Sequence, residues 1–411
     1  MSRLNNYRLS ELYEMSSGIS TKPEQAGKGA PFLSFGTIYS NYILPDVLDD
    51  RMDTTPAEQE KYSIRYGDVF LTRTSETIDE LAMSSVALKN YPTATFSGFA
   101  KRLRPLDCSF PNPAFMAFYL RSPHFRKIIE CMTTMTTRAS FNEDLFSFLN
   151  VTLPSLDEQF SIGELLVSIE KKQTINKQIN DNLQHMMATL YDYWFTQFNF
   201  PDDNGVPYKS SGGKMVWNEE LKMHIPAGWK CIRLGDILTK NVTEIAPSKP
   251  IPTIDLSVMP SDSFALAMLN NSGKFNTNLY EMNEGDLLFG GIRPYLHKAG
   301  IAPCSGAVAG TVRSFHVKRP DDYNYALFTL CSKTMFNYAE SVSTGTRMPT
   351  VSSNDLLARR VAYNPDISAR FNSIDVRGTI INNVQDSLAL QSLRDWLLPL
   401  LMNGQATIKQ P

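Results

Sequence analysis

The sequence predicts an α+β protein: two similar α/β domains separated by a long antiparallel two-helix coiled coil, with a pseudo-twofold internal repeat. Two observations predict this fold class. A segment of some forty residues from Pro154 onward has coiled-coil periodicity, and the order of strand, turn and helix signals in the first half returns in the second. At 411 residues, the chain is long enough for two or three domains, each with its own core.

The segment 154–198 is predicted to be one helix. Ser155 and Glu158 form a capping-box pattern at its start, and about 40 residues at ~1.5 Å each give a rod of roughly 60 Å. Apolar residues recur at alternating spacings of three and four, as in the seam of a coiled coil. The predicted seam comprises Ile162, Leu165, Ile169, Lys172, Asn176, Ile179, Leu183, Met186 and Leu190. Periodicity alone leaves open a long amphipathic helix inside a large domain.

Lys172 and Asn176 are the polar members of this seam, and we expect them to fix its register and partner at some cost in stability. The helix ends in an aromatic cluster, residues 191–198, for which we expect a mixture of core packing and docking surface.

The repeat supplies a partner for this helix. Arg233–Asp236 is similar to Arg8–Glu11, Gly285–Phe289 to Gly67–Leu71, and Thr344–Arg347 to the segment that ends at Arg138. Residues 371–402 then take the place of the long helix, with a seam predicted at Ile381, Val384 and Leu388. The predicted boundaries are a first domain at 1–153, a first helix at 154–198, a linker at 199–226, a second domain at 227–367, a second helix at 368–403 and a tail at 404–411.

Composition argues against several classes of protein. The net charge of −2 disfavours a protein that coats nucleic acid without regard to sequence, although a local basic face remains possible. The five cysteines form no C-x-x-C pair and the five histidines show no metal-ligand spacing, so we expect neither disulfides nor a metal site. Without a signal-peptide pattern or a long apolar run, the chain is expected to be cytoplasmic and to avoid the membrane.

Several motifs in a fixed order give the chain a family resemblance. They are the capped helix start Pro154–Gln159, the helix end Leu190–Phe195, the restart Gly228–Asp236, the segment Gly285–Leu296 and the ending Leu393–Gln405. Together they resemble the specificity subunit of Type I restriction-modification systems, over essentially the whole chain. The second helix departs from the pattern, because Pro365–Arg370 lacks the Pro-x-x-Asp/Glu-Gln start of the first.

The resemblance implies a non-catalytic subunit without a cofactor. Two target-recognition domains would each read one half of a bipartite, asymmetric site in double-stranded DNA. The coiled coil would separate them and dock two DNA-methyltransferase subunits, and restriction subunits would complete the complex.

Arginine and lysine contact phosphates and guanine edges, and small hydroxyl residues contact the DNA backbone. Candidates were therefore sought beside the repeated strand and turn signals. They are Thr72, Arg73, Thr74, Lys101, Arg102 and Arg138 in the first half, and Arg293, Tyr295, Lys298, Arg313, Thr346 and Arg347 in the second. Each of them taken singly is equally well explained as a solvated surface residue.

Two other classes of function remain as alternatives. One is a coiled-coil scaffold whose paired domains bind peptides or carbohydrates. The other is a self-contained adenine DNA methyltransferase, because Asn112–Phe115 is similar to an Asn-Pro-Pro-Phe/Tyr motif. No glycine-rich loop for a methyl donor accompanies that motif, so we predict that Asn112 marks a helix start.

Overall fold

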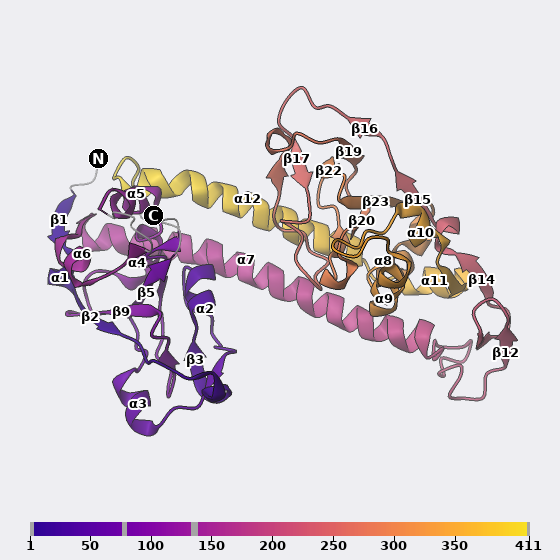
Figure 1. Cartoon of the computed structure of the whole chain (residues 1–411), viewed down its shortest axis with the longest axis horizontal. Helices are drawn as coiled ribbons and strands as arrows, with labels where there is room; N and C mark the ends of the chain where they lie inside the picture. The colour runs from indigo at the N-terminus through magenta and orange to yellow at the C-terminus, as the bar shows by residue number, and fades with distance from the viewer. Residues whose placement is uncertain (1–3, 76–79, 133–138, 409–411) are drawn as a thin grey trace. The chain divides into compact units, whose positions relative to one another are not determined.

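The computed structural model describes residues 4–75, 80–132 and 139–408. The chain divides into two compact units, Met1–Lys171 with Gln391–Pro411, and Lys172–Leu390. Each unit contains one α/β domain and a part of each of two long helices, α7 (Leu156–Tyr191) and α12 (Val376–Met402) (Figure 1). The predicted fold class is confirmed.

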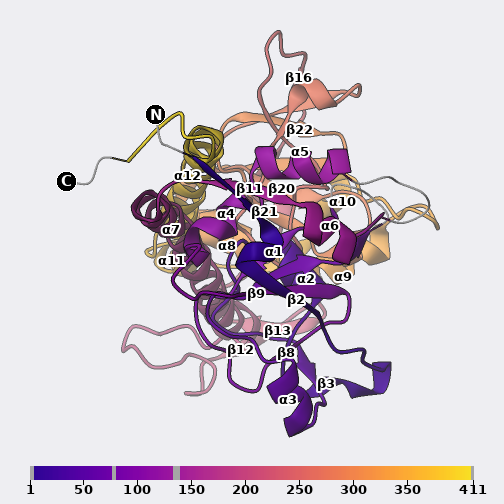
Figure 2. The same cartoon turned by 90° about the vertical axis from the view of Figure 1, so that its left-hand side faces the viewer.

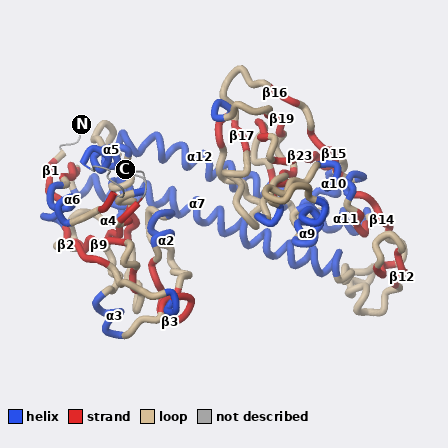
Figure 3. The backbone as a smooth tube through the Cα atoms, viewed as in Figure 1, coloured by secondary structure: helices blue, strands red, loops and turns tan. Residues whose placement is uncertain are grey.

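The first repeat alternates short strands and short helices before α7 (Figure 3). Its elements are β1 (Asn5–Arg8), α1 (Leu9–Leu12), β2 (Tyr13–Ser17), η1 (Pro23–Gln25), β3 (Ala26–Leu33), α2 (Phe35–Ser40), β4 (Arg51–Met52), α3 (Pro56–Lys61), β5 (Val69–Thr72), β6 (Thr74–Ser75), β7 (Ser84–Val86), β8 (Thr95–Phe96), β9 (Ala100–Pro105), α4 (Pro113–Tyr119), α5 (Pro123–Met132), β10 (Ala139–Ser140), α6 (Glu143–Phe148), β11 (Asn150–Leu153), α7 and a π-helical turn (Asp192–Thr196).

A hairpin of β12 (Met215–Asn218) and β13 (Met223–Pro226) precedes the second repeat. The elements of that repeat are β14 (Lys230–Arg233), η4 (Leu234–Asp236), β15 (Leu238–Asn241), β16 (Glu244–Ile245), β17 (Pro252–Ile254), β18 (Asn270–Asn271), η5 (Ser272–Lys274), β19 (Leu279–Met282), β20 (Leu287–Gly290), η6 (Pro294–Leu296), β21 (Ala299–Ile301), β22 (Gly306–Ala309), β23 (Val312–Val317), η7 (Pro320–Asp322), α8 (Tyr323–Leu330), α9 (Lys333–Val342), α10 (Ser353–Ala358), β24 (Arg360–Tyr363), α11 (Pro365–Phe371) and α12.

The two repeats share the topology of their four-stranded sheets. The antiparallel order β2-β9-β5-β7 in the first corresponds to β15-β23-β20-β21 in the second. Outside these sheets, β1 pairs with β11 as β14 pairs with β24, and the parallel pair β3–β8 matches β17–β22. The strand register shows which residues are equivalent. Phe70 pairs with Arg102 in the first repeat, and Leu288 pairs with Ser314 at the same place in the second. This agreement, element by element, supports an internal duplication.

The long helices pair in an antiparallel sense. In the second unit the side chain of Gln173 on α7 bonds the Ser387 carbonyl on α12, and farther along α7 the Asn180 amide oxygen accepts from Asn383, earlier in α12. In the first unit, Glu170 forms an ion pair with Arg394. Figure 2 shows α7 and α12 side by side. Each helix thus has the other as its seam partner.

The buried line along α7 differs from the predicted seam at every second position. Both include Ile162, Ile169, Asn176, Leu183 and Leu190, with the last two partly buried against the core. Between these, each of Leu166, Gln173, Asn180 and Met187 is more buried than the predicted residue before it: Leu165, which is half-buried, and Lys172, Ile179 and Met186, which are exposed. Met186 is 68% exposed and Ile179 44%.

The correction has a simple cause. Spacings of three-then-four and four-then-three have the same period. The apolar Ile179 and Met186 favoured the first spacing, whereas the buried residues follow the second. The true seam contains a polar layer in which Asn176 donates to Asp386, Ser387 and the Asn383 carbonyl. On α12, Ile381 and Val384 are buried and Leu388 packs against the core.

The helix that begins after Asn112 is short, because α4 ends at Tyr119 and Pro123 begins α5. The predicted second helix, 368–403, is α11 followed by α12 from Val376, and the Asn324 amide donates to the Phe371 and Ile374 carbonyls at the break. The Asp375 carboxylate accepts from Gly378 N at the new helix start.

The aromatic cluster after α7 is mainly core. Phe195 and Phe198 are buried, and the Phe195 ring packs against Trp229, Tyr325 and Phe371 of the second repeat. The C-terminal end of α7 is therefore part of the second unit's core.

Candidate nucleic-acid interface

A three-way backbone junction forms where β5 ends. The amide of Arg73 donates to the Phe99 carbonyl at 2.8 Å, and the Arg73 carbonyl accepts from Phe141 N at 2.8 Å. The residue after β5 thus ties the turn before β9 to the segment before α6. We call Arg73, Phe99 and Phe141 the first junction.

The second repeat has the same junction. Gly291, which follows β20, donates to the Thr311 carbonyl at 2.8 Å and accepts from Val351 N at 2.9 Å. These positions match the first junction through the register of β20 with β23. Gly291, Thr311 and Val351 are therefore the second junction. Equal backbone bonds hold different side chains at the two sites.

Polar side chains gather beside the second junction. The amide of Arg293 donates to the Pro349 carbonyl, and Thr344 and Thr350 exchange two backbone bonds that close a short loop. Gly345 occupies the left-handed region at φ 94°, which favours glycine. Thr346 and Arg347 lie exposed in this loop, and Arg293 and the half-exposed Tyr295 lie on the facing segment. The structure thus joins the segment that carries Arg293 to the loop that carries Thr346 and Arg347, and Tyr295 follows Arg293 by two residues.

Fewer predicted residues can be placed at the first junction. Arg73 is exposed and Thr74 half-buried. Arg138, which corresponds to Arg347, lies outside the described residues.

Three predicted contacts of the first repeat are buried within it. The Thr72 hydroxyl donates to the Glu80 carbonyl and accepts from Met83 N, and Lys101 forms an ion pair with Glu143 at 3.4 Å. Arg102 donates to the Ser63 carbonyl, and burial lowers the pKa of its guanidinium. The side chains of these three residues are therefore engaged by the protein's own groups in this structure, and their role as DNA contacts stays a prediction.

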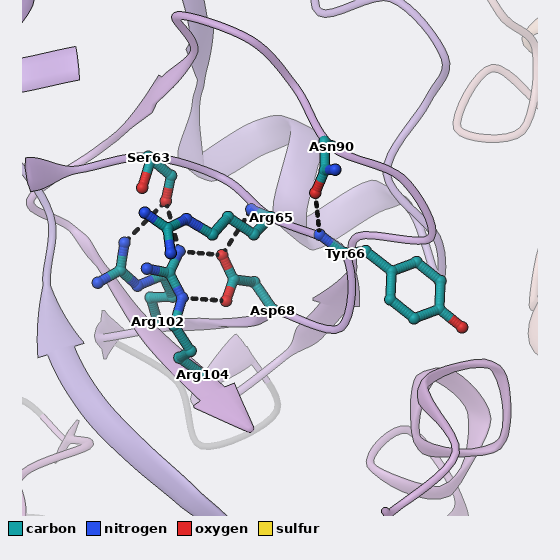
Figure 4. A network of polar contacts seen from close by, with 7 residues as sticks. All are labelled: Ser63, Arg65, Tyr66, Asp68, Asn90, Arg102 and Arg104. Atoms are coloured by element: carbon teal, nitrogen blue, oxygen red, sulfur yellow. Dashed lines mark hydrogen bonds and ion pairs between the residues drawn. The ribbon is translucent and has the colours of Figure 1, made fainter. Parts of the chain in front are cut away.

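A buried carboxylate organises the arginines of β9. Asp68 accepts from both the Nε and Nη2 atoms of Arg104, at 2.8 and 2.6 Å, and from Arg65 N (Figure 4). Its hydrogen bond raises the pKa of Arg104. The Arg102 and Arg104 side chains share the Ser63 carbonyl. This network serves the fold.

Lys298 and Arg313 of the second repeat are half-buried and support the chain rather than project from it. Lys298 donates to the Leu256 carbonyl. Arg313 donates to the carbonyls of Val351 and Gly310, so its guanidinium braces the second junction. Gly291 permits this, because a Cβ there would lie 2.7 Å from Arg313 Nε. Both side chains thus support the chain in this structure, and their role as DNA contacts stays a prediction.

Asn112 is a helix cap, as predicted. Its side-chain oxygen accepts from Phe115 N, and its backbone N–H donates to Gln159, a fully buried residue of α7. A Cβ on Gly163 would lie 2.9 Å from Phe115 N, so glycine allows α7 to approach α4. The motif that resembled a methyltransferase signature thus joins two helices.

Within the described residues no group of three or more histidine, cysteine, aspartate or glutamate side chains is arranged to hold a metal ion. The described helices include none that is both long and apolar enough to cross a membrane.

Residues 1–185 match the family model described as "Type I restriction modification DNA specificity domain". The chain is 22% identical over 377 residues to the Type I restriction enzyme MjaIX specificity subunit of Methanocaldococcus jannaschii. The match covers 84% of this chain and 85% of that protein. It is 23% identical over 178 residues to the EcoKI specificity subunit of Escherichia coli K12, spanning 42% and 37%.

One solved structure resembles the whole chain in fold. The S subunit of a Type I restriction-modification system from M. genitalium superposes with a TM-score of 0.57 at 13% identity, covering 100% of this chain and 97% of the other.

Proposed function

We propose that this chain, which is similar to the specificity subunits of Type I restriction-modification systems, recognises a bipartite, asymmetric DNA target without catalysing a reaction itself. It would direct two DNA-methyltransferase subunits, and restriction subunits where the host supplies them, to that target. The main support is the duplicated junction. One backbone framework presents Arg73 and Phe99 in the first repeat, and Thr311 with Arg293 and Arg347 nearby in the second.

Different side chains on one framework are what an asymmetric target needs. A symmetric site would be served by identical repeats, whereas each half of an asymmetric site needs its own set of hydrogen-bonding groups. Arginine at these positions suits phosphates and guanine, and the Thr-Gly-Thr-Arg loop allows backbone N–H groups to approach a phosphate. Each domain would therefore determine one half-site.

The helices would set the distance between half-sites. The 36 residues of α7 correspond to about 54 Å at ~1.5 Å each, or about 16 base pairs at ~3.4 Å each. We propose this as an upper limit on the separation of the two half-site centres.

The outer faces of the helices offer a surface for the methyltransferase subunits. In the first unit Phe160, Leu393 and Trp396 are exposed on α7 and α12, and in the second Ile179 and Met186 are exposed on α7. Exposed apolar groups of this kind mark protein contacts. One such face in each unit fits two bound subunits.

A domain exchange tests this function. The chain is purified with its native partners, and modified sites are mapped in the host genome. Residues 1–153 are then replaced by the corresponding domain of another specificity subunit. The expected result is a change in one half-site only, with the other half-site and the spacing preserved. A change in both halves, or methylation without sequence preference, contradicts the proposal.

A further inference from the structure

The most unusual side chain near the first junction is Phe99. It is 67% exposed and lies in the turn between β8 and β9. A single exposed apolar side chain is ordinary on a protein surface, so exposure alone does not identify a function. What sets Phe99 apart is the rigidity of its turn and its place in the repeat.

The turn is fixed from three sides. Phe99 N donates to the Ser97 hydroxyl, Gly98 N to the Ile19 carbonyl, and Arg73 N to the Phe99 carbonyl. A Cβ on Gly98 would lie 2.9 Å from the Ile19 carbonyl oxygen, so the neighbouring strand packs tightly against the turn. The backbone that presents this ring is therefore held in place before any ligand binds.

The equivalent position in the second repeat is Thr311, and its surroundings differ in kind. Thr311 borders an open groove whose other walls include Phe275, Asn276, Asn278 and Tyr280. The Thr311 hydroxyl can form hydrogen bonds, whereas the Phe99 side chain cannot. At this one position the first junction thus presents an apolar ring and the second a hydroxyl group.

An apolar ring beside an exposed guanidinium suits a particular contact with DNA. Proteins insert phenylalanine between base steps, or stack it on an unstacked base, while neighbouring cations hold the phosphates. Arg73 is bonded through its backbone to Phe99, so the cation and the ring occupy one fixed edge.

We propose that Phe99 is a base-stacking wedge: it enters the base stack at one step of the half-site bound by the first domain, whereas the equivalent residue of the second domain, Thr311, has no ring to insert. The first half-site is then selected partly by how easily that step unstacks, whereas the second is selected by hydrogen bonds. This inference rests on the proposed function and adds a specificity-determining residue to it.

The test uses the native complex with its methyltransferase subunits and a duplex that contains the mapped target. 2-Aminopurine, whose fluorescence rises when it unstacks, replaces each purine of the first half-site in turn. With the natural chain we expect a rise at one step. Phe99→Ala should abolish the rise and weaken binding about 10-fold or more, whereas Phe99→Tyr should retain both.

Phe148→Ala is the matched control, because Phe148 lies in the same repeat and is 71% exposed. It should change neither signal. Persistence of the rise in Phe99→Ala, or unchanged affinity, overturns the wedge, as does an equal loss of affinity for DNA of unrelated sequence. In each of these cases the natural chain still prefers its target, so the proposed function stands. If the natural chain shows no preference, both proposals fail.

Discussion

In the first repeat the buried carboxylate of Asp68 is held by the guanidinium of Arg104, whereas in the second the equivalent Asp286 faces His316, whose side chain is 70% exposed. Both carboxylates follow a glycine with positive φ, Gly67 or Gly285, and both accept a bond from the backbone N–H three residues before them. The turn is common to both repeats, and the partner on the adjacent strand is not.

This difference separates two kinds of residue. Those that close turns and caps recur because the framework needs them in both repeats. Those on β9 and β23 vary, and in the first repeat they formed the basic run that sequence alone assigned to DNA. Charge on a repeated strand is therefore weak evidence for a ligand, whereas exposed residues at the repeated junctions are stronger candidates.

Removal of the buried carboxylate should show the largest contrast between repeats. Asp68→Ala leaves the Arg104 guanidinium without its partner, and loss of one member of such a pair costs about 3–5 kcal/mol. Asp286→Ala loses hydrogen bonds to Asn283 N and Ser314, at about 1–3 kcal/mol. Urea denaturation of the whole chain gives the free energies, and hydrogen exchange of β9 and β23 amides assigns them to a repeat.

Asp46→Ala is the control, since its ion pair with Lys89 is on the surface and should contribute less than about 1 kcal/mol. Equal losses for Asp68→Ala and Asp286→Ala would show that the arginine adds nothing to the first repeat.

The two long helices allow a second comparison, between neighbouring methionines of α7. Met187 is 2% exposed and Met186 is 68% exposed. Met187→Ala should lower the free energy of unfolding by about 2–3 kcal/mol because it leaves a cavity, whereas Met186→Ala should change it by less than about 0.5 kcal/mol. Thermal and urea unfolding of the two variants measure this. The reverse order would restore the seam predicted from the sequence.

Asn112 is the N-cap residue of α4, and Asn324 lies in the first turn of α8. Asn112→Ala removes a helix cap, worth about 1 kcal/mol. Asn324→Ala leaves the Phe371 and Ile374 carbonyls without the side-chain amide that donates to both. We expect this to lower the free energy of unfolding by about 2 kcal/mol. Hydrogen exchange at residues 371–376 should accelerate in the second variant only. Unchanged exchange there would mean that the helix break does not depend on this amide.

The order of strands and helices could be predicted from the sequence because the same signals occur in both repeats. Gly-Asp turns, the Ser155 cap and the order of strands recur with local chemical reasons, so the fold class and the duplication could be predicted. The seam phase could not, because Ile179 and Met186 are as apolar as Leu166 and Met187 and only the partner helix distinguishes them. Phe99 could not be predicted either, because an apolar side chain offers no hydrogen bond to a phosphate or a base edge. The Gly98 beside it was the available signal for a turn.

The smallest expected effect concerns the exposed arginines of the two junctions. Arg73→Ala and Arg347→Ala should each weaken binding to the native target by about 1 kcal/mol, and a residue that contacts only phosphate should also lower the salt dependence by about one ion. Lys222→Ala, in the linker hairpin, serves as the control because it removes an exposed cation outside both junctions.

The informative measurement is affinity for targets mutated in one half-site at a time. If Arg73 contacts a base of the first half-site, its removal should reduce discrimination there and leave the second half-site unaffected, and Arg347 should behave in the opposite way. Uniform losses across all sequences would assign both arginines to the DNA backbone, and specificity would then depend on other residues of each junction.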